Sequence, residues 1–312
     1  MAGILDGVDQ RTQMAGQNRL ELLLFSLGTK QRFGINVFKV QEVIQCPPLT
    51  HMPHSHPSVR GVANMRGKTI PVLDLAMAIG QEPAEAGDEG RFVIITEYNR
   101  AVQGFLVDSV DKIVNMEWKD ILPPPKGTGG NTYMTAVTNV DDELVEIIDV
   151  EKVISEIHEV DTSVSESMVA EANISGEFPR RILVADDSSV ARNQIKRTIE
   201  QLGMEVILAN DGKQGLDKLR AMAEEGGDIQ DQILLVISDI EMPEMDGYTL
   251  TTEIRKDERL KNLHIILHTS LSGVFNETLV KKVGANRFVA KFSADELSGS
   301  VIDYIKSIGG EI

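Results

Sequence analysis

The sequence has one cysteine, few basic residues and no long apolar run. With Cys46 alone, no intrachain disulfide can form, which is consistent with a reducing compartment. The 31 lysines and arginines are outnumbered by 48 aspartates and glutamates, giving a formal net charge of -17. This balance, without any basic cluster, argues against nucleic-acid binding, which requires clustered lysine and arginine on the phosphate backbone.

Features that place a protein in a membrane are also missing. No apolar run approaches the ~20 residues that a membrane-spanning helix needs. The first residues, MAGILDGVDQ, lack the basic and apolar regions of a secretory signal. We therefore expect a cytoplasmic protein without direct membrane insertion.

The length predicts two domains, because a single hydrophobic core stops growing near ~250–300 residues and this chain has 312. Residues 18–158 contain short β-like runs separated by turn signals, which predict an all-β barrel or sandwich. Residues 159–179 are rich in serine, glutamate and alanine and show no core face, so we expect a linker. Residues 180–312 alternate five short apolar runs with helical patterns, which predicts a doubly wound α/β sheet of five parallel strands. No internal repeat is visible.

Polar side chains follow the apolar runs of the second domain. Asp186 and Asp187 follow ILVA, Asp239 follows ILLVIS, Thr269 follows IILH, and Lys291 follows FVA. The carboxyl ends of parallel strands meet at one edge of a doubly wound sheet, so we expect these residues to form one site. Three carboxylates repel each other unless cations are present, and Lys291 with a divalent ion would balance their charge. Oxygen ligands favour Mg²⁺, and such a site suits phosphoryl transfer with Asp239 as the acceptor.

Two alternatives compete with this interpretation. The Asp186-Asp187 pair precedes two serines and a helical pattern, so it could be only a helix N-cap. Asp239 with Glu241 also resembles the D-x-D nucleophile of phosphatases of the haloacid dehalogenase kind, which would make the protein a hydrolase.

The motifs ADDSS, SDIEMPEMDG, HTS and FVAK, in this order, resemble the receiver domain of two-component response regulators over about residues 180–308. The thirty residues from Asp239 to Thr269 and the twenty-two from Thr269 to Lys291 also match that family. The resemblance implies that Asp239 accepts the phosphoryl group. It further implies roles for the other site residues: Mg²⁺ held by Asp186, Asp187, Asp239 and the carbonyl of Glu241; phosphoryl contact by Thr269 and Lys291; and rotation of Phe288 on switching.

The sequence departs from the receiver pattern at Phe292. Receivers usually place a proline after the lysine, joined by a cis bond, whereas a cis bond before a residue other than proline costs ~2.5–4 kcal/mol. Because of this departure, an alternative is a working coupling scaffold whose receiver is silent or poorly active.

The first domain shows no catalytic pattern: it lacks a glycine-rich phosphate loop, a Ser-His-Asp arrangement and an acidic cluster. Its stretches LLLFSLGTKQRFGINVFKVQEVI (22–44) and VRGVANMRGKTIPVLDL (59–75) resemble the CheW coupling domain of bacterial chemotaxis. The resemblance implies a pair of five-strand barrels that bridges chemoreceptor tips to the histidine kinase CheA. The positions that it assigns to partner contact are Glu42, Arg66 and Arg60, with Val37 and Val40 as the apolar part.

Three histidines, His51, His54 and His56, lie close together in HMPHSHP, but the prolines and the absence of nearby cysteine or carboxylate ligands favour an exposed loop over a metal site.

A coupling domain fused to a receiver resembles the CheV-type chemotaxis family. This resemblance implies a cytoplasmic adaptor at membrane-associated receptor arrays rather than an enzyme. It also implies that CheA phosphorylates Asp239 to cause adaptation or to drain phosphoryl groups. A transcriptional regulator is a further alternative, because many receivers control DNA binding, but the net charge of -17 argues against it.

Overall fold

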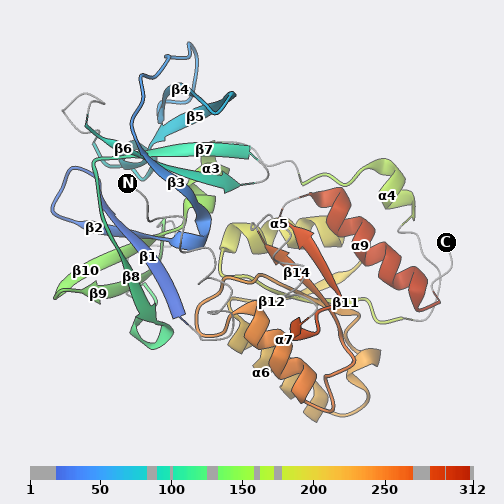
Figure 1. The fold of residues 1–312 in the computed structure, drawn as a ribbon. Helices are drawn as coiled ribbons and strands as arrows, with labels where there is room; N and C mark the ends of the chain where they lie inside the picture. The colour runs from blue at the N-terminus through green and yellow to red at the C-terminus, as the bar shows by residue number, and fades with distance from the viewer. Residues whose placement is uncertain are drawn as a thin grey trace. The chain divides into compact units, whose positions relative to one another are not determined.

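A computed structural model provides the structure of the protein. It describes residues 19–82, 90–98, 101–124, 133–157, 162–171, 178–269, 282–291 and 293–309. The chain divides into two compact units, Arg19–Glu159 and Val160–Ile312, and each is described by itself (Figure 1). Within the described ranges, no helix is both long enough and apolar enough to cross a membrane.

The first sheet of the N-terminal unit has five strands in the order β8-β1-β2-β10-β9. Its strands are β1 (Arg19–Ser26), β2 (Arg32–Asn36), β8 (Ser109–Glu117), β9 (Met134–Val140) and β10 (Glu143–Ile148). Strands β2 and β10 are parallel, and the other neighbours are antiparallel. Alternate residues of β1 and β10, among them Leu22, Leu24, Val145 and Ile147, pack in one cluster, as expected for a sheet with one buried face.

The second sheet also has five strands, in the order β3-β6-β7-β5-β4. Its strands are β3 (Val40–Gln45), β4 (Val59–Met65), β5 (Lys68–Asp74), β6 (Phe92–Tyr98) and β7 (Ala101–Val107). Here β5 and β7 are parallel and the other neighbours are antiparallel. Single-turn helices η2 (Val37–Lys39) and η3 (Trp118–Asp120) follow β2 and β8.

The two sheets share one plan that the sequence did not reveal. In each sheet, the segment that follows one edge strand forms a bridge to the other edge strand. Leu122, after β8, pairs with Val137 of β9, and Thr50, after β3, pairs with Val62 of β4. In each, a two-residue turn leads into the strand that pairs in parallel: Arg66-Gly67 before β5 and Asp141-Asp142 before β10. All four turn residues have positive φ, between 49° and 79°, as two-residue hairpins require. The two five-stranded sheets therefore repeat one plan, although no internal repeat is visible in the sequence.

An aspartate lies at the end of one parallel-paired strand in each sheet: Asp74 is the last residue of β5, and Asp149 directly follows β10. Asp74 Oδ1 accepts a hydrogen bond from Met77 N at 3.2 Å and caps α2 (Leu75–Ala78). Asp149 Oδ1 accepts from Lys152 N at 3.0 Å in α3 (Val150–Ile157). Such caps satisfy backbone donors that the first turn of a helix leaves open.

The C-terminal unit has a parallel sheet in the order β12-β11-β13-β14-β15. Its strands are β11 (Arg181–Ala185), β12 (Glu205–Ala209), β13 (Leu235–Ser238), β14 (His264–Thr269) and β15 (Arg287–Ala290). Its long helices are α5 (Ser189–Glu200), α6 (Gly212–Glu224), α7 (Gly247–Lys256) and α9 (Ala294–Ser307), and the turn η4 (Ile229–Asp231) precedes β13. The predicted fold class, an all-β first domain and a doubly wound five-strand second domain, is confirmed.

Two apolar clusters cover the two faces of this parallel sheet. Ile182 and Val184 of β11 pack with α5 and α9 on one face, whereas Leu183 and Ala185 pack with α6 and α7 on the other. Successive residues of a strand point to opposite faces, so a strand buried on both faces is apolar throughout. This is why the sequence shows ungapped apolar runs here.

Part of the segment that was expected to be a linker packs on the C-terminal unit. It contains the short helix α4 (Glu166–Glu171), and Val164 before that helix is 7% exposed. Val164 belongs to the cluster under α5 and α9, and Met168 and Phe178 pack against the same cluster. The absence of a core face, inferred from composition, therefore does not hold for these residues.

His264 begins β14 and stacks on Tyr304 of α9, with ring centroids 3.8 Å apart. Burial lowers the pKa of His264 from 6.5 to about 4, and the charges of Arg287 and Arg255 add to the effect. The ring is therefore neutral in the folded unit at pH values where the unfolded chain already binds a proton.

The stability of the C-terminal unit should consequently fall as the pH is lowered from 6.5 toward about 4, because the unfolded state takes up the proton first. Because water screens part of the effect at this partly buried ring, we expect the free energy of unfolding to fall by about 1–2 kcal/mol over this pH range. His264→Phe keeps the stack and should lose less stability in this pH window, in urea unfolding read by pulse proteolysis. The exposed His51→Phe should behave as wild type; equal acid sensitivity in all three proteins would contradict the prediction.

Candidate functional site

The candidate site lies where three parallel strands end. Residues Ala185 of β11 and Ser238 of β13 are paired in register, and Asp239 N donates to the carbonyl of Ala185 at 2.8 Å. Asp186 and Asp239, which directly follow, therefore leave the sheet side by side. Lys291 directly follows β15, two strands along. The register of the sheet thus brings together residues that lie more than one hundred positions apart in the sequence.

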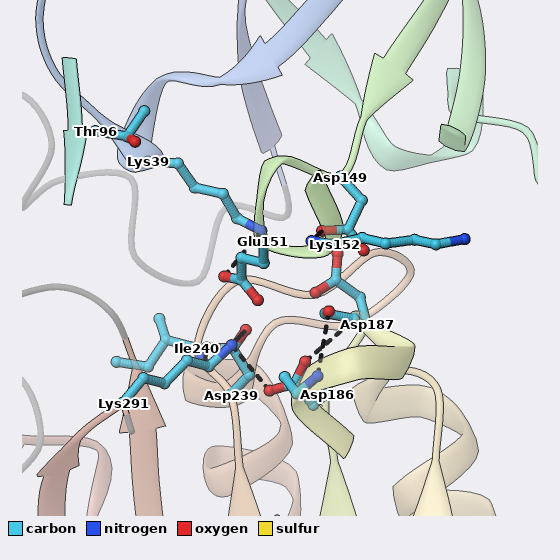
Figure 2. Close-up of polar contacts among 12 residues, drawn as sticks. Lys39, Thr96, Asp149, Glu151, Lys152, Asp186, Asp187, Asp239, Ile240 and Lys291 are labelled. Atoms are coloured by element: carbon cyan, nitrogen blue, oxygen red, sulfur yellow. Dashed lines mark hydrogen bonds and ion pairs between the residues drawn. The ribbon is translucent and has the colours of Figure 1, made fainter. Parts of the chain in front are cut away.

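Lys291 joins two of the carboxylates. Its Nζ lies 2.7 Å from Asp239 Oδ2 and 2.8 Å from Asp186 Oδ2, and Figure 2 shows the three side chains converging. All three are buried, with exposures of 0% for Asp186 and 3% for Asp239 and Lys291. Removing charges from water is costly unless they are paired, and Lys291 supplies a positive charge to both carboxylates.

Backbone amides fix the second oxygen of each of these carboxylates. Ile240 N donates to Asp239 Oδ1 at 2.7 Å (Figure 2), and Ser188 N donates to Asp186 Oδ1 at 2.9 Å. Each carboxylate therefore has one oxygen held by the backbone and one directed at Lys291. The N-cap of α5 is Ser188, whose hydroxyl accepts from Ala191 N at 3.3 Å. The cap alternative does not account for Asp186 and Asp187.

The carboxylates fit a divalent cation. One oxygen from each of Asp186, Asp187 and Asp239 can be chosen so that all three lie within 4.8 Å of one another. Three negative charges and the one positive charge of Lys291 leave a net charge of -2 at this cluster. Carboxylate-only ligands with this charge suit a hard cation such as Mg²⁺. Among the residues that the structure describes, this is the sole such group, and His51, His54 and His56 form none.

The sequence interpretation missed Arg192. Its Nη1 donates to the backbone carbonyls of Asp186 at 2.6 Å and Asp187 at 2.9 Å. One guanidinium on α5 therefore holds the two peptide units that carry the acidic pair. The available signal was an arginine in the first turns of the helix that follows the acids, which is also a common surface residue.

For the remaining predicted site residues, the structure describes only part of the predicted contacts. Glu241 lies two residues after Asp239, and its side chain is buried; the role of its carbonyl stays a prediction. Phe288 of β15 is partly buried against the cluster of α6 and α7. Thr269 ends β14, but its side chain lies outside the described residues, as does Phe292 with the geometry of its peptide bond.

The loop after Asp239 is held by close backbone packing. Gly247 N, at the start of α7, donates to the carbonyl of Ile240 at 2.9 Å. Asp246 caps the same helix, accepting from Thr249 N at 2.6 Å. Burial raises the pKa of Tyr248 above its usual value, and the charges of Glu241 and Asp246 raise it further. The start of α7 and the loop after Asp239 thus form one tightly packed turn.

In the N-terminal unit, the predicted partner-contact residues divide by exposure. Arg66, in the β4–β5 turn, is 82% exposed at its side chain, and its Nη2 lies 2.9 Å from Glu42 Oε1. Val40 and Arg60 are partly buried, whereas Val37 is buried at 6% exposure. The ion pair of Arg66 and Glu42 is therefore accessible to a partner, and Val37 offers little surface.

Comparison with known proteins covers both units. Residues 21–158 match the CheW-like domain family, and residues 182–301 match the response regulator receiver domain family. Chemotaxis protein CheV3 of Helicobacter pylori is 31% identical over 274 residues, spanning 86% of this chain and 87% of that protein. Chemotaxis protein CheV1 of the same organism is 26% identical over 325 residues, spanning 98% of this chain and 99% of that protein.

A shorter relative matches the first unit alone. Chemotaxis protein CheW of Klebsiella aerogenes is 29% identical over 157 residues, spanning 50% of this chain and 92% of that protein. The order of the two domains, together with the full-length similarity, shows that the chain belongs to the CheV family of chemotaxis proteins.

Proposed function

We propose that the protein is a chemotaxis adaptor whose N-terminal unit couples chemoreceptors to the kinase CheA and whose receiver is phosphorylated on Asp239. The observation that supports the acceptor role is the position of Lys291 Nζ, 2.7 Å from Asp239 Oδ2 and 2.8 Å from Asp186 Oδ2. A buried carboxylate beside a fixed ammonium and two further carboxylates is arranged to take a charged group rather than to pack a core. The adaptor role is supported by the CheW-like domain, the similarity to chemotaxis proteins and the accessible Arg66–Glu42 pair.

Phosphoryl transfer would proceed by displacement at phosphorus. A carboxylate oxygen of Asp239 forms a bond to phosphorus while the bond from phosphorus to the imidazole nitrogen of the kinase phosphohistidine breaks. The electron pair stays on that nitrogen, which takes up a proton from solvent. The ammonium of Lys291, which already contacts Asp239, would then bind the negatively charged phosphoryl oxygens.

Asp186, Asp187 and Asp239 would hold a divalent cation such as Mg²⁺, with the carbonyl of Glu241 as the predicted further ligand. When bound, this ion supplies positive charge that offsets the phosphoryl oxygens. The residues of the chain do the rest: Ile240 N holds Asp239 in place, and Arg192 holds the peptides of the acidic pair.

Asp239→Asn should abolish phosphoryl uptake, because an amide oxygen is a poor nucleophile and the acyl phosphate cannot form. The measurement is intact mass after incubation with acetyl phosphate or phosphorylated CheA and Mg²⁺. Wild type should gain one phosphoryl group per chain, and so should the control Asp231→Asn, whose exposed aspartate lies outside the site. Normal labelling of Asp239→Asn would show that the acceptor lies elsewhere.

The same experiment separates the competing functions. Repeated release of phosphate from a phosphate ester, many cycles per chain, would favour a hydrolase over an adaptor that is not an enzyme. No label on wild type, with label on Phe292→Pro, would favour the silent receiver. Whether phosphorylation changes receptor-coupled kinase activity then reports the output.

Arg66→Glu should weaken binding to receptor-tip fragments about tenfold, because charge reversal opposes an accessible ion pair without changing the core. The free energy of unfolding should change by less than about 0.5 kcal/mol, since the side chain is 82% exposed. Lys68→Glu, an exposed reversal two residues along, is the matched control. The double variant Glu42→Arg with Arg66→Glu keeps an ion pair but reverses it, and so tests whether its orientation matters. If Arg66→Glu, Lys68→Glu and the double variant all bound receptor-tip fragments as wild type does, Arg66 would not be a contact residue.

A further inference from the structure

Residues 162–171, here called the strap, lie against the receiver rather than hanging between the units. Figure 1 shows α4, which is part of the strap, alongside α9. Val164 is 7% exposed within the cluster under α5 and α9, and Met168 packs at the edge of that cluster. The receiver therefore presents a docking surface whose occupant is a segment of its own chain.

Two receiver side chains hold the backbone of the strap. Gln201, at the end of α5, accepts from Val164 N at 3.1 Å and donates to the carbonyl of Thr162 at 2.9 Å. Asp295, in the first turn of α9, accepts from Ser165 N at 2.9 Å. The backbone contacts fix the strap in one register, and Val164 anchors it.

The docked strap is held by a small number of contacts. A six-residue helix is too short to be stable by itself. Ordering the strap is opposed by the conformational entropy of its ten residues and is offset by one buried valine, one partly buried methionine and three hydrogen bonds to receiver side chains. Because the strap is held by so few contacts, loss of one of them removes a large share of what holds it.

The hydrogen bond from Ser165 N to Asp295 lies close in sequence to the acidic site. Lys291 contacts both Asp239 and Asp186, Ser293 caps α9, and Asp295 follows four residues after Lys291. Three residues of the sequence separate Lys291 from Asp295, the residue whose carboxylate accepts from Ser165 N.

We propose that phosphorylation of Asp239 releases the strap. The added phosphoryl oxygens draw Lys291 away from its place between Asp186 and Asp239, and the first turn of α9 follows. The bond from Ser165 N to Asp295 is lost, and the strap leaves its surface. The strap begins five residues after the end of α3, so its release lengthens the chain segment that joins the two units. This inference rests on the proposed function of Asp239.

Hydrogen exchange of the full-length protein tests the proposal. Exchange at Val164, Ser165 and Val169, whose amides are bonded in the docked state, is compared before and after loading with acetyl phosphate and Mg²⁺. We expect exchange to rise about three- to tenfold on loading, the range that loss of one hydrogen bond produces. Asp295→Ala should raise exchange at the same amides without loading, and loading should add little.

Asp303→Ala is the matched control, since Asp303 lies on the same helix but pairs with Arg287 instead of the strap; its strap should exchange as in wild type. Intact mass measures the load in the same sample. A loaded protein with unchanged exchange would overturn release while leaving the acceptor role intact. Absence of any load would overturn both. Fast exchange before loading, unaffected by Asp295→Ala, would show that the strap is not docked.

Discussion

Replacing Gly247 with alanine should destabilise the receiver by more than about 3 kcal/mol, because the new methyl group has no room. A Cβ at this position would lie 2.1 Å from the backbone carbonyl oxygen of Asp239 and 3.0 Å from Ile240 Cα. The atoms in the way are backbone, so relief requires moving the start of α7 or Asp239 itself. Phosphoryl uptake should therefore fall even at temperatures where the variant remains folded.

Gly215→Ala is the matched control for this substitution. Gly215 lies in α6, and the nearest atoms to its added methyl group would be side-chain carbons at 3.5–3.7 Å, which is ordinary contact. Its stability should stay constant or rise by up to about 1 kcal/mol, since alanine favours helix over glycine. Urea unfolding and labelling by acetyl phosphate measure both quantities. If Gly247→Ala matched this control in both, the close packing at the acceptor would be unimportant.

Asp74→Ala should destabilise the N-terminal unit by about 3–5 kcal/mol. The side chains of Asp74 and Arg91 are buried, at 0% and 3% exposure, with Oδ2 and Nη1 3.5 Å apart. The substitution removes this carboxylate from a buried guanidinium and also removes the cap of α2. Both losses act in the second sheet, so receptor-tip binding should fall with stability.

Removing both charges should restore most of the loss. The double variant Asp74→Leu with Arg91→Met replaces the pair by apolar groups, which is often close to neutral for buried ion pairs. Glu42→Ala is the control for an exposed pair and should cost less than about 1 kcal/mol, because water screens it. Similar losses for Asp74→Ala and Glu42→Ala, in urea unfolding followed by pulse proteolysis, would show that burial of the pair does not matter.

The acidic cluster could be predicted from the sequence because its residues follow apolar runs. Strands of a parallel sheet end at one edge, so Asp186, Asp239 and Lys291 had to be neighbours once the five runs were assigned as strands. Arg192 could not be found in the same way. It binds backbone carbonyls through a side chain, and no spacing or periodicity marks such a contact.

Docking of the strap could not be predicted from the sequence, because the segment is mostly polar. Val164 and Met168, four residues apart, lie in a mostly polar segment, and two such positions are too few to establish a periodic pattern. Its neighbours in space, Gln201 and Asp295, lie 37 residues from Val164 and 130 residues from Ser165. Polar composition predicts that a segment cannot build a core of its own, but it does not predict whether the segment adds to an existing one.

The shared plan of the two sheets was hidden for a different reason. IPVLDL (70–75) and VEIIDV (145–150) occupy equivalent places, yet aligned position by position they have only the aspartate in common. A half-buried strand requires alternating apolar character rather than particular residues. Similar structures can therefore arise from sequences in which no repeat can be recognised.

The equivalent turns of the two sheets carry opposite charge. Arg66 occupies one turn, and Asp141 occupies the other, where Lys112 holds the pKa of its carboxyl below the usual value. A partner that recognises the Arg66 turn with an acidic group would be repelled by the Asp141 turn. The two sheets share a strand plan but differ in the charge of their equivalent turns, so a charged partner would favour one turn over the other.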